Sequence, residues 1–177
     1  MLSSLLRSLA SALLTPARRS GTRGPRRYPV SDGPAPQQPS PGRSGPGATR
    51  DLSRAEIATL RPDYQPRPDG DPDPGEVVWT WVPYAENDGR GKDRPVLIIA
   101  RLGEGAVAGC YLSTKPHSGF VSVGSGAWDG QGRESFLAPE RVLRVTADGM
   151  RREGHVLSRD RFDRAVTAVR RAHGLRG

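Results

Sequence analysis

The stretch GEVVWTWVPY (Gly75–Tyr84) and, after a polar loop, the stretch RPVLIIARL (Arg94–Leu102) decide the fold of this chain. The first is rich in β-branched and aromatic residues, places Val77, Trp79 and Trp81 on one face, and ends at a proline, as a strand bounded by a turn does. The second is a continuous apolar run behind a proline, which is typical of a strand buried on both faces or at the core of a small barrel. Both stretches are therefore predicted to be β-strands.

Outward from these strands, the sequence predicts further short elements. They are a hairpin turn at 103–105, a return strand at 106–114, short strands at 120–126 and within 135–145 on either side of a Gly-rich loop, and a helix that Ser158 caps and Gly174 ends. Short, closely spaced strands followed by one helix favour a mainly β fold with a C-terminal helix, in the form of a small, partly open barrel, over a sandwich or a βαβ fold.

The residues before the first strand have a different composition. Leucines at near-helical spacing predict a short amphipathic helix at 2–14, which is either an organellar transit peptide or a segment without fixed structure. The residues after it are mainly Pro, Gly, Ser and Arg, which indicates a linker, and DLSRAEIATL (51–60) is expected to form one or two helical turns behind an Asp51 or Ser53 cap. We therefore expect two parts, a disordered N-terminal extension over 1–73 and one domain over 74–177.

The charge of the chain is unevenly distributed. The formal net charge is +8, but residues 1–50 carry 8 Lys and Arg against 1 Asp, whereas residues 51–177 carry 19 Lys and Arg against 18 Asp and Glu. A nearly balanced domain does not bind nucleic acid through a broad basic field, although a few well-placed groups suffice for a specific site. The high pI is therefore no indication of function.

Cys110 is the sole cysteine of the chain, which excludes an intrachain disulfide and a zinc site built on thiolates. Its simplest role is that of a small buried apolar residue. This cysteine usage suits a reducing cytoplasm, which is the expected location. No apolar run approaches the roughly 18–20 residues that span a bilayer, so we expect no membrane insertion.

Three groups of tracts resemble the PemK/MazF-like toxins of type II toxin–antitoxin systems. GEVVWTWVPY followed by a Gly-rich loop and RPVLIIA is similar to the family's opening, and YLST (Tyr111–Thr114) is similar to the hydroxyl-bearing end of its next long strand. The tracts GSGAWD, SFLAPERVLRV and REGHVLSRDRFDRAV resemble the variant found in high-GC bacteria. The resemblance covers about residues 74–175.

This resemblance implies a fold and a function. The fold is an SH3-like barrel, usually a homodimer. Its implied activity is the cleavage of single-stranded RNA at short motifs without a metal or another cofactor, leaving 2′,3′-cyclic phosphate and 5′-OH ends. The implied partners are single-stranded RNA and a cognate antitoxin, with operator DNA as a further ligand of the toxin–antitoxin complex.

Such a reaction needs a cation near the phosphate, hydrogen-bond donors and acid–base help. Arg94 is the candidate cation, because a guanidinium binds phosphate through two hydrogen bonds and Pro95 keeps Arg94 extended; the alternative is a charge that merely flanks a hydrophobic strand. Ser113 falls on the position of the family's catalytic threonine, with Thr114 one residue away. Strand alternation lets only one of these two hydroxyls face the Arg94 side.

Four further residues are candidates for the site. His117 is a candidate general base, because imidazole changes protonation near neutral pH, or else a solvated loop residue. Lys92 and Lys115 are candidate phosphate contacts, with solvated surface charge as the alternative. Trp128 is a candidate platform on which an unpaired base stacks, or else a side chain that fills the core under a Gly-rich loop.

One departure from the family leaves other functions open. In one branch an Arg and an Asp on a later strand act as acid and base, but this chain has Phe136 and Ala138 in those places. A catalytically inactive barrel that binds nucleic acid or a protein is therefore one alternative. Another is a regulatory or scaffolding protein that its basic tail tethers to a membrane surface or to nucleic acid.

Overall fold

The computed structural model describes residues 40–67 and 69–175. The amphipathic helix predicted at 2–14 lies outside these residues. Within them the chain is mainly antiparallel β-structure with a C-terminal helix, which confirms the predicted fold class.

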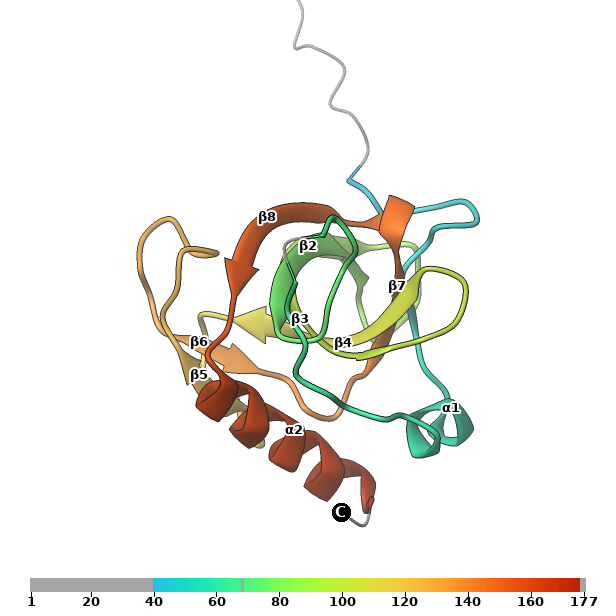
Figure 1. The fold of residues 1–177 in the computed structure, drawn as a ribbon. Coiled ribbons are helices and arrows are strands. Elements are labelled where there is room, and N and C mark those ends of the chain that lie inside the picture. Colours follow the sequence, from blue (N-terminus) through green and yellow to red (C-terminus); the bar gives the residue numbers. More distant parts are fainter. Residues whose placement is uncertain (1–39, 68, 176–177) are drawn as a thin grey trace, which may run out of the picture. The chain divides into compact units, whose positions relative to one another are not determined.

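The sheet is built from short strands around a long central one. Its path is β1-β7-β4-β3-β2-β8, and β6 pairs with both β4 and β5. The strands are β1 (Arg50–Asp51), β2 (Glu76–Pro83), β3 (Gly91–Arg101), β4 (Ala106–Ser113), β5 (Val121–Gly124), β6 (Ser135–Leu137), β7 (Leu143–Thr146) and β8 (Arg151–Val156). Figure 1 shows β2, β3 and β4 curving strongly in the middle of this unit, with β8 beside β2.

The centre of β3 is buried on both faces, as its continuous apolar sequence predicted. Every residue from Val96 to Ala100 is 0% exposed. Leu97 and Ile99 belong to one apolar cluster, which includes the buried side of the C-terminal helix, and Val96 and Ile98 belong to a second cluster. Because the strand has a core on each face, its ends are the places where side chains reach the surface.

The C-terminal helix α2 (Arg159–His173) packs along β5 (Figure 1). Phe162, Val166 and Val169 are buried on one face, as predicted from their spacing. Ser158 occupies the N-cap position but makes no side-chain cap hydrogen bond, and Gly174 ends the helix at φ 64°. None of the helices in the described part of the chain is long and apolar enough to cross a bilayer.

The folded unit begins much earlier than the boundary expected near residue 74. The folded unit includes the described residues from Ser40 onward, β1 pairs with β7, and the short helix α1 (Arg54–Ala58) is capped by Ser53 in a capping box with Glu56. Three apolar side chains of this segment join the core, namely Leu52, Ile57 and Leu60. They are too few and too widely spaced to reveal a folded segment in a Pro-rich sequence, which is why the composition was misleading.

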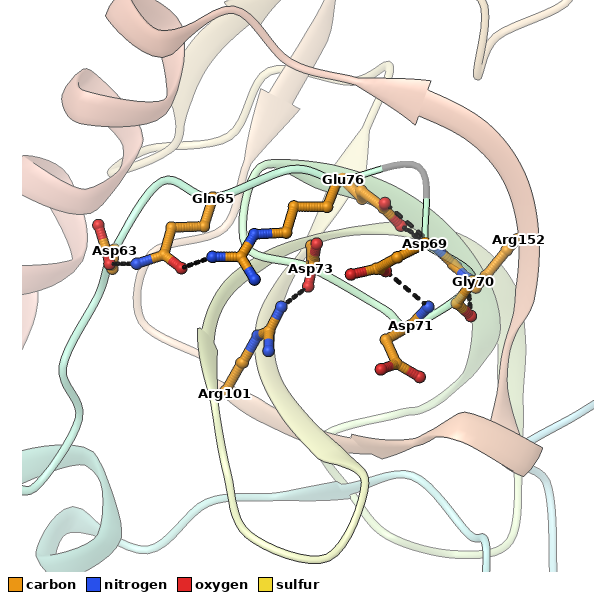
Figure 2. Close-up of polar contacts among 10 residues, drawn as sticks. Asp63, Gln65, Asp69, Gly70, Asp71, Asp73, Glu76, Arg101 and Arg152 are labelled. Carbon is orange, nitrogen blue, oxygen red and sulfur yellow. Dashed lines mark hydrogen bonds and ion pairs between the residues drawn. The ribbon is translucent and has the colours of Figure 1, made fainter.

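The acidic connector, residues 61–76, is also tied to the barrel (Figure 2). Asp73 is 0% exposed and bonds to Arg101 of β3. Glu76 is paired with Arg152 of β8 at 3.0 and 2.9 Å, and Arg152 also donates to the carbonyl of Gly70. These ion pairs hold the segment together with Tyr64, whose ring packs edge-on against Phe162 at 5.2 Å.

The short strands expected within 135–145 are β6 and β7, which Pro139 and the following turn separate. Strand β8 was not expected, because nearly all of its residues are exposed and it lacks the alternation of a half-buried strand. It forms because it pairs with β2, a contact between segments that are far apart in the sequence.

Candidate active site

A cavity of about 250 Å³ lies where β2, β3 and β4 meet the loop before β6. All seven residues singled out from the sequence line it, although they come from three separate parts of the chain: Lys92, Arg94, Ser113, Thr114, Lys115, His117 and Trp128. The remaining lining residues are Trp79, Pro95, Leu112, Asp129, Arg133 and Ser135. The cavity thus has a largely apolar floor and a polar, cationic rim.

The strand wall of the cavity is formed by the start of β3 and the end of β4. Val96 pairs with Tyr111, so Arg94 and Ser113, each two residues further toward the cavity, lie on the same face of the sheet. The Arg94 guanidinium lies 5.1 Å from the centre of the Tyr111 ring, a cation–π contact that steadies it.

Ser113 and Thr114 differ in their position on the strand. Ser113 is the last residue of β4, whereas Thr114 follows the strand and is exposed. The Ser113 Oγ accepts a hydrogen bond from the backbone N–H of Lys115 at 3.1 Å. Because that bond uses a lone pair of the oxygen, the hydroxyl hydrogen remains to be donated to a ligand in the cavity.

The loop after β4 carries the imidazole. His117 is exposed, and its ring centre lies 5.0 Å from that of Phe120. Phe120 in turn packs edge-on against Tyr111 at 5.9 Å. A row of rings therefore connects His117 to the residue that supports Arg94.

The loop wall, residues 125–134, supplies two groups that the sequence analysis missed. Arg133 and Asp129 form an ion pair at 2.7 Å, and the backbone N–H of Arg133 also donates to the Asp129 carboxylate at 2.7 Å. The Arg133 guanidinium lowers the pKa of Asp129 to about 2, with help from the backbone hydrogen bonds. Asp129 is therefore ionised at neutral pH, and its pairing holds Arg133 at the rim. Opposite charges four residues apart were the available signal, but that spacing is informative in helices rather than in Gly-rich loops.

Trp128 anchors this loop wall in the core. It is 4% exposed, and its Nε1 donates to the Ser135 Oγ at 3.0 Å. Gly126 passes so close that a Cβ there would lie 2.1 Å from the indole ring. Because so little of the ring is exposed, it offers no open face for a base, and of the two expected roles the structure places Trp128 in the one that fills the core.

Phe136 and Ala138 supply no acid–base pair. Phe136 pairs with Ser113 across β4 and β6, and Ala138 is 2% exposed. These two positions therefore bring no ionisable side chain to the cavity, and the imidazole among its lining residues is that of His117.

The domain is nearly balanced in charge, but positive side chains predominate at this cavity. Lys92, Arg94, Lys115 and Arg133 line the cavity against the single carboxylate of Asp129. Of these four cationic residues, Arg133 is the one that forms an ion pair with another residue of 40–67 or 69–175. The other three face the cavity without a carboxylate partner, which suits a polyanionic ligand.

No family model matches the chain. No curated protein matches it either. Solved structures do resemble it in fold. One is described as an endoribonuclease in complex with its cognate antitoxin from a Mycobacterial species, with 17% identity, 60% of this chain and 98% of that chain covered, and a TM-score of 0.47.

Two other similar structures are a MazE-MazF complex from Deinococcus radiodurans and the Mycobacterium tuberculosis toxin MazF-mt6. The first has 15% identity, covers 59% of this chain and 98% of that chain, and has a TM-score of 0.45. The second has 15% identity, covers 58% and 99%, and has a TM-score of 0.44. At these values the similarities do not by themselves define what the chain does.

Proposed function

We propose that this protein is a toxin of a type II toxin–antitoxin system that cleaves single-stranded RNA without a metal ion. The observation that carries the proposal is the cavity of about 250 Å³, which brings a guanidinium, a strand-end hydroxyl and an imidazole together with two lysines. These are the groups that cleavage by the neighbouring 2′-OH requires. The motifs that resemble PemK/MazF-like toxins lead to the same reaction.

In this mechanism His117 accepts the proton of the ribose 2′-OH as the 2′-oxygen forms a bond to phosphorus. The bond from phosphorus to the 5′-oxygen breaks, and the departing oxygen takes a proton from water. The hydroxide that remains takes the proton held by His117, which restores the neutral imidazole. The products are a 2′,3′-cyclic phosphate and a 5′-OH end, so protons and bonds balance without a cofactor.

The negative charge that develops on the phosphate has partners in both walls of the cavity. Arg94 binds the non-bridging oxygens, and the Ser113 hydroxyl donates to them from the same face of the sheet. Lys92 and Lys115 contact the flanking phosphates. Arg133 adds a second guanidinium, and Asp129 is its positioning residue, because a carboxylate with a pKa of about 2 is too weak a base to take the 2′-OH proton.

We further propose that the toxin is a cytoplasmic homodimer and that a cognate antitoxin inhibits it. A second copy or the antitoxin would cover Trp81, which is half-buried on β2 and does not line the catalytic cavity; Trp79, also half-buried, does line it. The complex of the toxin with its antitoxin would bind operator DNA as a further ligand.

A second candidate function is RNA binding without cleavage. The observation in its favour is that Phe136 is apolar and Ala138 is buried, so the later strand brings no acid or base to the cavity. The cationic rim would then hold RNA without cutting it.

The deciding experiment is incubation of the full chain with a long single-stranded RNA in the presence of EDTA. We expect fragments with 5′-OH ends from the wild type and none from Arg94→Ala. The matched control is Arg164→Ala, which removes an exposed arginine of α2 that does not line the cavity. RNA that is bound but left intact by the wild type would establish the second candidate instead.

A further inference from the structure

A second cavity lies next to the proposed active site, and Arg94 lines both. This second cavity has a volume of about 360 Å³ and is formed by the end of β2, the turn after it and the residues around Tyr111. Its charged lining residues are Glu86, Arg90, Arg94 and Arg141. A phosphate held by Arg94 would therefore have an open space on each side.

The inner wall of the second cavity is rigid. Arg141 is 21% exposed and binds both carboxylate oxygens of Asp51, at 2.9 and 2.8 Å. It also donates to the carbonyl of Pro83 at 3.0 Å. Its guanidinium lies 6.0 Å from the Tyr111 ring, which is also the ring that Arg94 contacts. The N-terminal segment thus positions one wall of this cavity through Asp51.

The outer wall carries an exposed aromatic ring. Tyr84 is 36% exposed, and among the described residues the large apolar side chains with this degree of exposure are Tyr84 and Val156. The Tyr84 backbone is fixed on both sides, because its N–H donates to the carbonyl of Arg90 and its carbonyl accepts from Asn87, both at 3.0 Å. Of the three guanidinium groups beside this ring, Arg90 is paired with the exposed Asp88 at 2.6 Å and Arg141 with Asp51, while Arg94 has no carboxylate partner among the described residues. An exposed ring on a closed turn beside them is suited to stacking with a base whose phosphate binds Arg94.

We propose that this second cavity binds a nucleotide of the same RNA strand, adjacent to the one at the active site. The base stacks on Tyr84, the phosphate between the two nucleotides lies on Arg94, and Arg90 contacts the next phosphate. The inference rests on the proposed function, because Arg94 is shared with the catalytic cavity. It makes the recognised substrate a run of at least two unpaired nucleotides centred on Arg94.

The test measures binding of short 2′-O-methyl RNA oligonucleotides, which lack the attacking hydroxyl, to the full chain by fluorescence anisotropy. Lengthening the oligonucleotide by one nucleotide at the end that enters the second cavity is expected to tighten binding about 5- to 100-fold, as stacking on one aromatic ring does. Tyr84→Ala should remove this gain and Tyr84→Phe should keep it. Val156→Ala, which truncates the other exposed apolar side chain, should change nothing.

Two results would overturn the inference. One is an equal gain from the added nucleotide in wild type and Tyr84→Ala; the other is a loss of affinity in Tyr84→Ala that is the same for every oligonucleotide length. If an acidic peptide binds the wild type but not Tyr84→Ala, while RNA binds both equally well, the cavity belongs to a protein partner instead. Because the oligonucleotides cannot be cleaved, failure of the proposed nuclease activity is seen separately, with long RNA.

Discussion

The two walls of the proposed catalytic cavity are built in different ways. The strand wall, with Arg94 and Ser113, lies at the ends of two paired strands whose register fixes both side chains on one face. The loop wall, with Asp129 and Arg133, has no such ladder and is held by the buried Trp128, by one ion pair and by turn hydrogen bonds such as that from the Gly132 N–H to the Asp129 carbonyl. Regular structure places the first pair, whereas individual side-chain contacts place the second.

This difference has a functional consequence. Backbone pairing in the strand wall has a buried core beneath it, so the separation of Arg94 and Ser113 resists thermal motion. The loop wall has no strand pairing, and each of its contacts holds only a few residues. We therefore expect RNA cleavage to depend most on the groups of the strand wall. Changes in the loop wall are expected to alter the cleavage rate by smaller factors.

The largest expected effect concerns the two hydroxyls of the strand wall. Ser113→Ala should lower the cleavage rate about 100- to 1,000-fold, because it removes a preorganised donor to the phosphate. Thr114→Ala should have a small effect, since Thr114 lies beyond the end of β4. The measurement is single-turnover cleavage of a fixed RNA. A larger loss in Thr114→Ala would show that strand register does not select the hydroxyl.

A smaller effect is expected in the loop wall. Arg133→Gln should slow cleavage about 10- to 100-fold, the range for one hydrogen bond to a charged group. Asp129→Asn should slow cleavage by a smaller factor than Arg133→Gln. The double variant should cleave RNA no more slowly than Arg133→Gln alone, because Asp129 acts through Arg133. Single-turnover rates of the three variants test this. Additive losses would show that Asp129 acts on the substrate independently.

The smallest effect is on the pH dependence of stability. The folded-state pKa of Asp129 is about 2, below that of an ordinary Asp, so its ion pair stabilises the fold above about pH 4 and this contribution is lost as the pH falls toward 2. The difference in free energy of unfolding between wild type and Asp129→Asn should stay constant from about pH 5 to 8 and shrink below about pH 4. Urea denaturation followed by tryptophan fluorescence measures it; a difference that persists unchanged at pH 2 would contradict an ionised pair.

The strand wall could be predicted from the sequence, and the loop wall could not. The apolar run behind Arg94 and the strand that ends at Ser113 have local patterns, so their elements were found within a few residues. Asp129 and Arg133 stand in a stretch of glycines with no periodicity, and their pairing depends on how Trp128 turns into the core. The same holds for β8, which exists because β2 offers it an edge.

By itself, the sequence determined the mainly β class, the helix from Arg159 to His173 and the candidate residues of the strand wall, because these depend on residue patterns over a few neighbours. The tertiary structure decided that residues 40–73 belong to the folded unit, that Arg133 stands across from Arg94 at one cavity, and that a second cavity lies on the other side of Arg94. Those facts depend on contacts such as Asp51 with Arg141, 90 residues apart. Local propensity carries no information about such pairs, which form only when the core brings them together.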